Sequence, residues 1–219
     1  MAETQFKGKK INYTIQGEGE ALVLIHGYLE SLEIWDEFAE DLTNDFKVIR
    51  VDLPGHGLSE VIQETHEMEL LAGAVKTVLD ENRVESAAVI GHSMGGYVTL
   101  AFADQYPETV SRFSLFHSHP FPDSEQVRQN RQNAIENIKA GKKEEICRSH
   151  VPKTFADDNL QAFSSHVERA QNIALQTPEQ GIISNLKGMM KRPDRSELVK
   201  DTNKPFLLIA GKKDNFIDY

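Results

Sequence analysis

Residues 87–96, with the sequence AAVIGHSMGG, constrain the fold of this chain more than any other stretch. Their first four residues are small or apolar, as in a buried strand, and residues 97–106 have helical character and stop at Pro107. Between the two, the pattern G-x-S-x-G places Ser93 at the apex of a sharp turn from strand to helix. Such a turn leaves no room for side chains beside the serine, and the start of the helix directs unpaired N–H groups toward it. The pattern therefore predicts a nucleophile elbow, with an ordinary serine in a glycine-rich turn as the alternative.

Strand and helix patterns alternate along the first 119 residues. Residues 10–16 alternate apolar and polar side chains, which predicts an edge strand of an antiparallel pair. Helical spacing of apolar residues follows Ser31, where the expected inward face consists of Ile34, Trp35, Phe38 and Leu42, and returns from Met68 to Leu79. Largely apolar runs, typical of strands covered on both faces, occur at residues 21–25, 47–51, 112–116 and 206–210. The alternation predicts an α/β fold in which a mostly parallel, twisted sheet carries helices on both faces.

The alternation stops after Pro120. Residues 123–200 contain no strand pattern and only polar helical segments, after which residues 206–210 resume the apolar pattern. A helical insertion between two strands of such a sheet lies over the carboxyl ends of the strands. We therefore expect a core of residues 1–119 and 201–219 and a helical lid, or cap, of residues 120–200. A helical extension packed away from the strand ends is the alternative.

The serine hydroxyl needs partners, because an unassisted hydroxyl is a weak nucleophile. It requires a base, and the base requires an orienting carboxylate. For this type of elbow the chain order is serine, then aspartate or glutamate, then histidine. Asp214 stands in a G-x-x-D turn just after a strand, which predicts a carboxylate at the carboxyl edge of the sheet. Asp123 is the second candidate for the acid, and a solvated turn aspartate is the alternative for Asp214.

An oxyanion hole needs two N–H donors. One comes from the residue after the nucleophile, which is Met94 here, and the other from the loop after the strand at residues 21–25. That loop reads His26-Gly27-Tyr28, so the backbone N–H of Tyr28 is the second candidate.

Four motifs in this order are similar to those of the alpha/beta-hydrolase fold superfamily. They are His26-Gly27-Tyr28, Asp52-x-Pro54-Gly55-His56-Gly57-x-Ser59, Gly91-His92-Ser93-Met94-Gly95-Gly96 and Gly211-x-x-Asp214. The chain most resembles the lidded, esterase-like branch of this superfamily. The resemblance covers about Ile11 to His119 and resumes at Lys204, while the expected lid matches only in position.

This resemblance implies a serine hydrolase that cleaves a small ester, thioester or related acyl substrate through an acyl-enzyme on Ser93, with Asp214 as the acid. Hydrolysis of carbon–carbon bonds, lactone opening, iminopeptidase cleavage and perhydrolysis use the same constellation and stay open. Epoxide hydrolases and haloalkane dehalogenases carry an aspartate at the position of Ser93, so these activities are not expected.

The general base of the family is a histidine after a last strand, and the 219 residues stop before such a strand. The favoured interpretation is that the last strand, its helix and the catalytic histidine lie beyond residue 219. A second is that His117 or His119 acts as a substitute base. A third is that the protein is a non-catalytic, ligand-binding pseudoenzyme. The histidines at 26, 56 and 92 are expected to support motif turns, and those at 66, 150 and 166 to lie on the surface.

The composition limits the classes of binding partner and the cellular compartment that are expected. The net charge of −10 argues against nucleic acid and anionic membranes. The single cysteine, Cys147, excludes an intramolecular disulfide and favours a reducing compartment, and no signal peptide or membrane span is evident, so a cytoplasmic location is expected. No metal cluster or nucleotide-binding glycine pattern is present, so no cofactor or metal is expected. The substrate's identity and the oligomeric state stay open.

Overall fold

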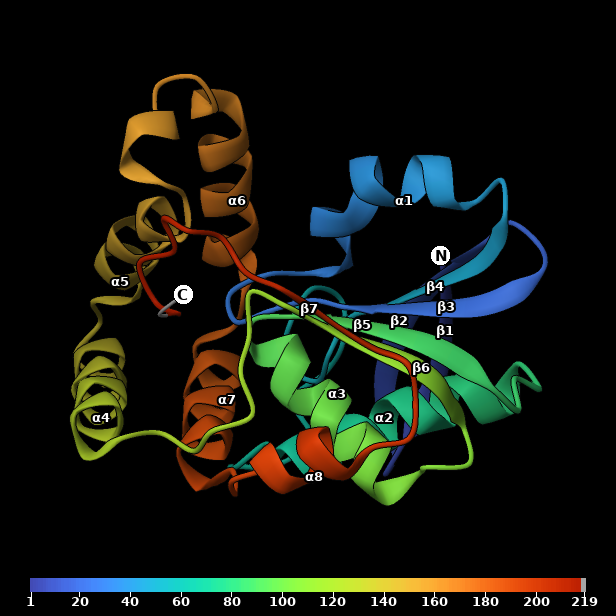
Figure 1. Cartoon of the computed structure of the whole chain (residues 1–219). Helices are drawn as coiled ribbons and strands as arrows, with labels where there is room; N and C mark the ends of the chain where they lie inside the picture. The colour runs from blue at the N-terminus through green and yellow to red at the C-terminus, as the bar shows by residue number, and fades with distance from the viewer. Residues whose placement is uncertain (218–219) are drawn as a thin grey trace.

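The computed structural model describes residues 1–217, which form one seven-stranded sheet with helices around it (Figure 1). The strands are β1 (Ala2–Phe6), β2 (Lys9–Gln16), β3 (Glu20–Ile25), β4 (Phe46–Val51), β5 (Ala87–His92), β6 (Val110–Phe116) and β7 (Phe206–Ile209). They lie in the order β1-β2-β4-β3-β5-β6-β7. The strands from β4 to β7 pair in parallel, and β2 pairs antiparallel with β1 and β4. The predicted α/β fold with a mostly parallel sheet is confirmed.

Helices cover both faces of the sheet because side chains alternate along the strands. The 3-10 helix η1 (Leu32–Trp35) and α1 (Asp36–Leu42) lie on one face, and α2 (Met68–Glu81), α3 (Met94–Gln105) and α8 (Ser196–Asp201) on the other (Figure 1). In β3, Val23 belongs to the core cluster that includes α2 and α3, whereas Leu24 belongs to the cluster around Trp35. The apolar face predicted for α2 is buried along its whole length.

Two predicted details of this region are wrong. Strand β2 is not an edge, because β1 pairs along its outer side, with Thr4 opposite Ile11. The face of the helix after Ser31 is also shifted, since Leu32 and Ala39 are buried beside Trp35. The side chains expected inside at positions 34 and 38, Ile34 and Phe38, are 36% and 45% exposed.

Between β6 and β7 the chain is helical. This segment contains α4 (Glu125–Lys139), α5 (Lys143–His150), η2 (Val151–Thr154), η3 (Asp157–Asn159), α6 (Ser164–Gln176) and α7 (Glu179–Lys191). In Figure 1 these helices gather at one end of the sheet. A side-chain amide connects the segment to the core, because Asn185 of α7 donates to the carbonyl of Pro54 at 3.0 Å.

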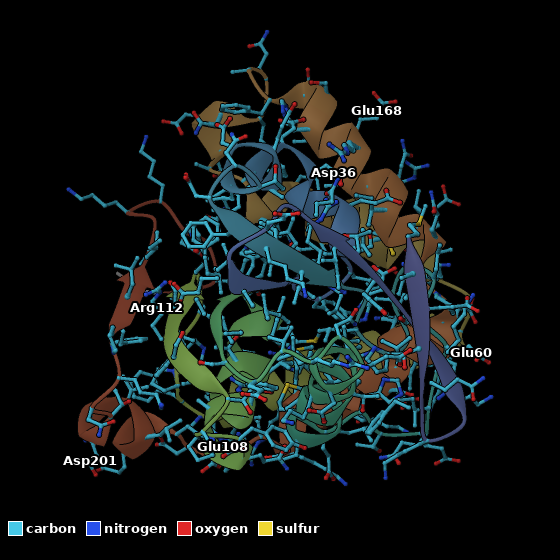
Figure 2. The ribbon with its side chains drawn as sticks, turned by 90° about the vertical axis from the view of Figure 1, so that its right-hand side faces the viewer. Asp36, Glu60, Glu108, Arg112, Glu168 and Asp201 are labelled. Carbon is cyan, nitrogen blue, oxygen red and sulfur yellow. The ribbon has the colours of Figure 1, made fainter. Side chains whose placement is uncertain are left out.

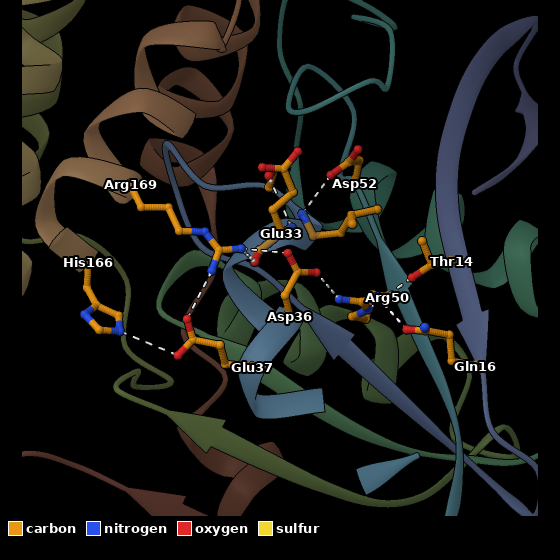
Figure 3. Close-up of polar contacts among 11 residues, drawn as sticks. Thr14, Gln16, Glu33, Asp36, Glu37, Arg50, Asp52, His166 and Arg169 are labelled. Carbon is orange, nitrogen blue, oxygen red and sulfur yellow. Dashed lines mark hydrogen bonds and ion pairs between the residues drawn. The ribbon is translucent and has the colours of Figure 1, made fainter. Parts of the chain in front are cut away.

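A second connection joins α6 to the sheet through charged side chains (Figure 3). Arg169 of α6 donates to a carboxylate oxygen of Asp36 at 2.6 Å and to the Glu33 carbonyl at 2.9 Å. Its other terminal nitrogen lies 3.4 Å from Glu37, which also faces His166 at 3.5 Å. Asp36 in turn binds Arg50 of β4. An ionic chain therefore runs from the helical segment through α1 into the sheet.

Strand β7 lies at the margin of the described sheet and pairs with β6 alone. The apolar run at residues 206–210 was expected to be buried, but Leu207 and Leu208 are each more than half exposed. The charged residues labelled in Figure 2, such as Glu60 and Arg112, are exposed and point away from the core. No helix within residues 1–217 is both long enough and apolar enough to cross a membrane.

Candidate active site

Ser93 occupies a backbone conformation that few residues adopt. It stands between the end of β5 and the start of α3 with φ +49° and ψ −115°. A Cβ added to Gly91 would lie 2.2 Å from the Gly95 carbonyl oxygen, and one added to Gly95 would lie 2.3 Å from the Ile25 carbonyl oxygen. These contacts leave no room for side chains at either glycine. The bend therefore has the geometry that the pattern G-x-S-x-G predicts.

Neighbouring strand ends hold the bend. The Ser93 N–H donates to the Phe116 carbonyl at 3.0 Å, and the Ser118 hydroxyl donates to the Ser93 carbonyl at 2.8 Å. Such strained residues persist only where the surrounding structure fixes them, and they gather at functional sites.

The bend opens into a cavity of about 490 Å³ at the carboxyl ends of the strands. Its walls come from β5, the segments after β3 and β6, helices α4, α5 and α7, and the segment after β7. Candidate site residues in its lining are Tyr28, Ser93, His117, His119, Asp123 and Asp214. Ligand sites of open parallel sheets lie at this edge. Among residues 1–217, no group of three or more potential metal ligands is gathered.

The carboxylate of Asp214 contacts a histidine ring. Its carboxylate lies 2.7 Å from Nδ1 of His117, the residue that follows β6. Burial opposes ionisation of Asp214, but hydrogen bonds from His117 and from the N–H groups of Phe216 and Ile217 outweigh it, so the pKa of the carboxyl is lowered. His117 also has a positive φ of 49°, and its own N–H donates to the Ile209 carbonyl at 2.8 Å. In the described part of the chain, the Ser93 hydroxyl makes no hydrogen bond to a histidine.

His119 has both ring nitrogens occupied. Nε2 lies 3.2 Å from the Tyr97 hydroxyl, and Nδ1 accepts the Phe121 N–H at 3.2 Å. Burial and the nearby Arg192 lower the pKa of His119 to about 4. The structure therefore pairs Asp214 with His117 and places His119 in a separate network.

Asp123, the second candidate for the acid, is bound by arginines rather than by a histidine. Its oxygens accept from Nε of Arg131 at 2.7 Å and from Nη1 of Arg192 at 2.5 Å. Burial opposes ionisation, yet the two guanidinium groups outweigh it and lower the pKa of Asp123. The Arg192 guanidinium also lies 3.9 Å from the centre of the Tyr97 ring.

The two expected oxyanion donors lie on segments in direct contact, because the start of α3 packs at Gly95 against the carbonyls of Ile25 and His26. Met94 opens α3, so its N–H has no acceptor within the helix. The loop of Tyr28 is fixed by Glu30, whose carboxylate accepts the Gly27 N–H at 2.5 Å.

Several residues of the cavity wall were not predicted from the sequence. Glu30 pairs with His92 at 3.0 Å, and Arg131 and His150 also line the cavity. The prediction that His150 lies on the surface is wrong, since its ring packs edge-on against Tyr28 with centroids 5.5 Å apart. The same prediction is wrong for His66, which is fully buried and accepts the Ile62 N–H at 3.1 Å. Sequence spacing carries no signal for the contacts of Glu30 with His92 and of Tyr28 with His150, because these partners come from distant elements.

Comparison with known proteins identifies the family and the fold of the chain. A sequence model of the alpha/beta hydrolase fold family matches residues 20–219. A 2-hydroxy-6-oxononadienedioate/2-hydroxy-6-oxononatrienedioate hydrolase of Paraburkholderia phymatum is 28% identical over 95% of this chain and 76% of its own length. An uncharacterized protein of Mycobacterium tuberculosis is 33% identical over 49% of this chain, and the matched region spans only 32% of that relative.

Among solved structures, a thermophilic esterase from Thermogutta terrifontis is similar, with a TM-score of 0.90 and 26% identity over 96% of this chain and 78% of its own. An enol-lactonase from Burkholderia xenovorans shares the fold, with a TM-score of 0.89 and 23% identity over 96% of this chain and 81% of its own. The sheet order, the bend at Ser93 and the cavity at the strand ends define an α/β protein with a strained serine between a strand and a helix. The chain belongs to the alpha/beta hydrolase fold family.

Proposed function

We propose that this chain forms the catalytic core of a serine hydrolase that cleaves a small ester, thioester or related acyl substrate. The observation that carries the proposal is the strained serine at a bend that opens into a 490 Å³ cavity, together with a histidine held by Asp214 in the same cavity. The relatives named as an esterase, at 26% identity, and as a hydrolase, at 28% identity, support this class of reaction.

In the proposed mechanism, a base removes the proton from the Ser93 hydroxyl as its oxygen attacks the substrate carbonyl. The N–H groups of Tyr28 and Met94 stabilise the negative charge on the tetrahedral intermediate. The base then gives the proton to the leaving group, which departs and leaves the acyl group on Ser93. In the second half the base takes a proton from water, whose oxygen attacks the acyl carbonyl, and returns the proton to the Ser93 oxygen as the bond to the acyl group breaks and the acid product leaves.

The base is proposed to be a histidine oriented by Asp214. His117 supports this role by its 2.7 Å contact with the carboxylate and its place in the wall of the cavity that Ser93 also lines. A histidine from beyond residue 219 would have to take over the same carboxylate. Replacing His117 by glutamine in the complete gene product distinguishes these two possibilities. Activity is lost if His117 is the base and is retained if another histidine is the base.

We also propose that residues 120–200 act as a lid over a core of residues 1–119 and 201–219. Helices α4, α5 and α7 each contribute residues to the wall of the cavity that Ser93 enters. Such a cover excludes water from the reacting groups and shapes the acyl pocket.

A non-catalytic, ligand-binding function is the second candidate, because the Ser93 hydroxyl makes no hydrogen bond to a histidine within residues 1–217. Hydrolysis of p-nitrophenyl acetate by the complete gene product, compared with Ser93→Ala, distinguishes the two. The hydrolase proposal expects nitrophenol release that depends on Ser93. Equal release by both proteins, or none by either, favours the ligand-binding candidate.

A further inference from the structure

Arg131 of α4 has hydrogen-bonding capacity that its structural partner does not use. Its Nε and Nη2 donate to the two oxygens of Asp123, at 2.7 and 3.2 Å. Within residues 1–217, its third nitrogen, Nη1, donates to no group. The side chain is 18% exposed and lines the cavity that Ser93 enters. An arginine with an unused donor in a cavity wall is a ready binding group for an anion.

Two further polar groups without partners lie on the same wall. The hydroxyl of Tyr28 is buried and has no hydrogen-bond partner in the described residues. Leaving a buried hydroxyl unpaired is costly, so such a group calls for a partner from outside the chain. His150, at the end of α5, contacts Tyr28 edge-on, and no hydrogen bond to its ring nitrogens is found in the same part of the chain.

The positive charge of Arg131 affects the pKa of both the Tyr28 hydroxyl and the His150 ring. Burial raises the pKa of the Tyr28 hydroxyl, and Arg131 opposes this rise. Burial and Arg131 together lower the pKa of His150 to about 4, so its ring is neutral at pH 7 and has one N–H to donate. Three donors of different types therefore belong to residues that line the same cavity, and two of them, Tyr28 and His150, are in ring contact.

We propose that Arg131, Tyr28 and His150 form a subsite for a carboxylate group carried by the acyl part of the substrate. This inference rests on the proposed hydrolase function and narrows its substrate class to acyl compounds with a free carboxylate. The subsite lies on the wall formed by α4, α5 and the loop after β3, and Ser93 lines the same cavity. The carboxylate would bind there while the ester carbonyl meets the serine.

The charges around the cavity favour a monoanion. Arg131 and Arg192 share a single carboxylate, that of Asp123, which leaves one positive charge on this wall. Glu30 and Asp214 also line the cavity, each beside a histidine. A phosphate monoester would bring nearly two negative charges toward these carboxylates. A carboxylate brings one charge and two planar oxygens, which suit the unused edge of a guanidinium.

The test compares two esters whose acyl chains have the same length, mono-p-nitrophenyl succinate and p-nitrophenyl butyrate. Arg131→Gln removes the charge, and Tyr28→Phe removes the hydroxyl while keeping the backbone N–H of residue 28. Arg148→Gln is the matched control, because Arg148 is exposed and pairs with Glu144 within α5. Hydrogen bonds to charged groups are worth about 1.5–3 kcal/mol, which corresponds to about 10- to 150-fold.

We expect wild-type kcat/KM to favour the succinate ester. Arg131→Gln should lower the kcat/KM of that ester by about 10- to 150-fold, mainly through KM, and change that of the butyrate ester by less than about 3-fold. Tyr28→Phe should act in the same direction, which keeps the test valid if Arg131→Gln fails to fold. A wild-type preference for butyrate, or equal losses for both esters, overturns the subsite.

Failure of the proposed function gives a different pattern, since wild type then hydrolyses neither ester. In that case succinate binding, followed by NMR on Ser93→Ala and on Ser93→Ala with Tyr28→Phe, decides the subsite alone. Binding that weakens about 10-fold or more when the hydroxyl is removed supports it. Binding that is absent or insensitive to this change overturns it.

Discussion

The imidazole Nδ1 of His92 lies 3.0 Å from the carboxylate of Glu30, and the same carboxylate oxygen accepts the N–H of Gly27 at 2.5 Å. One side chain therefore connects the residue before Ser93 to the residue before Tyr28. Burial opposes both charges, but their mutual attraction outweighs it, so the pKa of His92 is raised and that of Glu30 is lowered. The pairing favours the charged form of both groups and connects the two sides of the proposed oxyanion hole.

Replacing Glu30 by glutamine should lower kcat by about 10-fold, a smaller loss than removal of an oxyanion donor itself. KM should change little, because the pair positions the oxyanion N–H donors and does not itself bind the substrate in its ground state. Glu33→Gln is the control, since Glu33 lies in η1, shortly after Glu30, and is exposed. An unchanged kcat in Glu30→Gln contradicts a positioning role.

The same pair predicts a pH window for stability. The raised pKa of His92 gives stability that is complete below 6.5 and is lost as pH rises through the folded-state pKa. The lowered pKa of Glu30 gives stability that is present above 4.5 and is lost as pH falls through the folded-state pKa. Urea unfolding from pH 4 to 9 should show that Glu30→Gln loses most stability between these limits. A constant difference across this range contradicts the ion pair.

The two candidate acids should respond differently to removal of their charge. Asp214→Asn should lower kcat by about 10³- to 10⁴-fold with a small effect on stability, because it removes the group that orients the base. Asp123→Asn should cost about 3–5 kcal/mol of folding free energy, because the buried Arg192 and the partly buried Arg131 both lose their charged partner. Kinetics and urea unfolding of both variants check this. The reverse pattern would identify Asp123 as the acid.

The bend should be intolerant of even one extra methyl group. Gly91→Ala places a Cβ 2.2 Å from a backbone oxygen and should cost about 2 kcal/mol or more. Gly73→Ala is the control, because its Cβ would meet only the tip of Phe6, at 3.0 Å, and alanine favours the helix. Urea unfolding measures both. Equal stability of the two variants would contradict the tight bend.

The ionic chain in Figure 3 should control local opening rather than overall stability. Arg169 is 40% exposed, and exposed pairs are each worth only about 0.5 kcal/mol. Arg169→Gln should therefore speed amide exchange in α6 and leave Tm nearly unchanged, and salt should produce a similar effect in wild type. Arg148→Gln, which breaks a pair inside α5, should not speed exchange in α6. Unchanged exchange in Arg169→Gln contradicts this connection.

Most of the sheet could be predicted from the sequence because its signals are local. Apolar runs and the spacing from Met68 to Leu79 depend on residues close together in the chain. The position of β2 could not be predicted, because β1 has the sequence AETQF and lacks a clear alternating pattern. The burial of His66 could not be predicted from the sequence either, because its packing against Gly188 and Asn185 joins segments far apart in the chain.

For the candidate site, motifs predicted where Ser93 and Asp214 stand relative to the strands. They carried no information on Glu30 or Arg192, whose partners His92 and Asp123 lie more than 60 residues away along the chain. The contact between Asp214 and His117 spans 97 positions and depends on the pairing of β6 with β7. Long-range side-chain contacts of this kind follow from the packed fold and leave no periodic signal in the sequence.

The central claim is tested most directly by covalent labelling of the complete gene product with a fluorophosphonate probe, followed by peptide mapping. An activated serine displaces fluoride from the probe, whereas an ordinary hydroxyl does not react. We predict one adduct, on Ser93, that is absent from Ser93→Ala, while the neighbouring Ser118 stays unmodified. A folded protein that remains unlabelled, or that is labelled at another residue, would contradict the account.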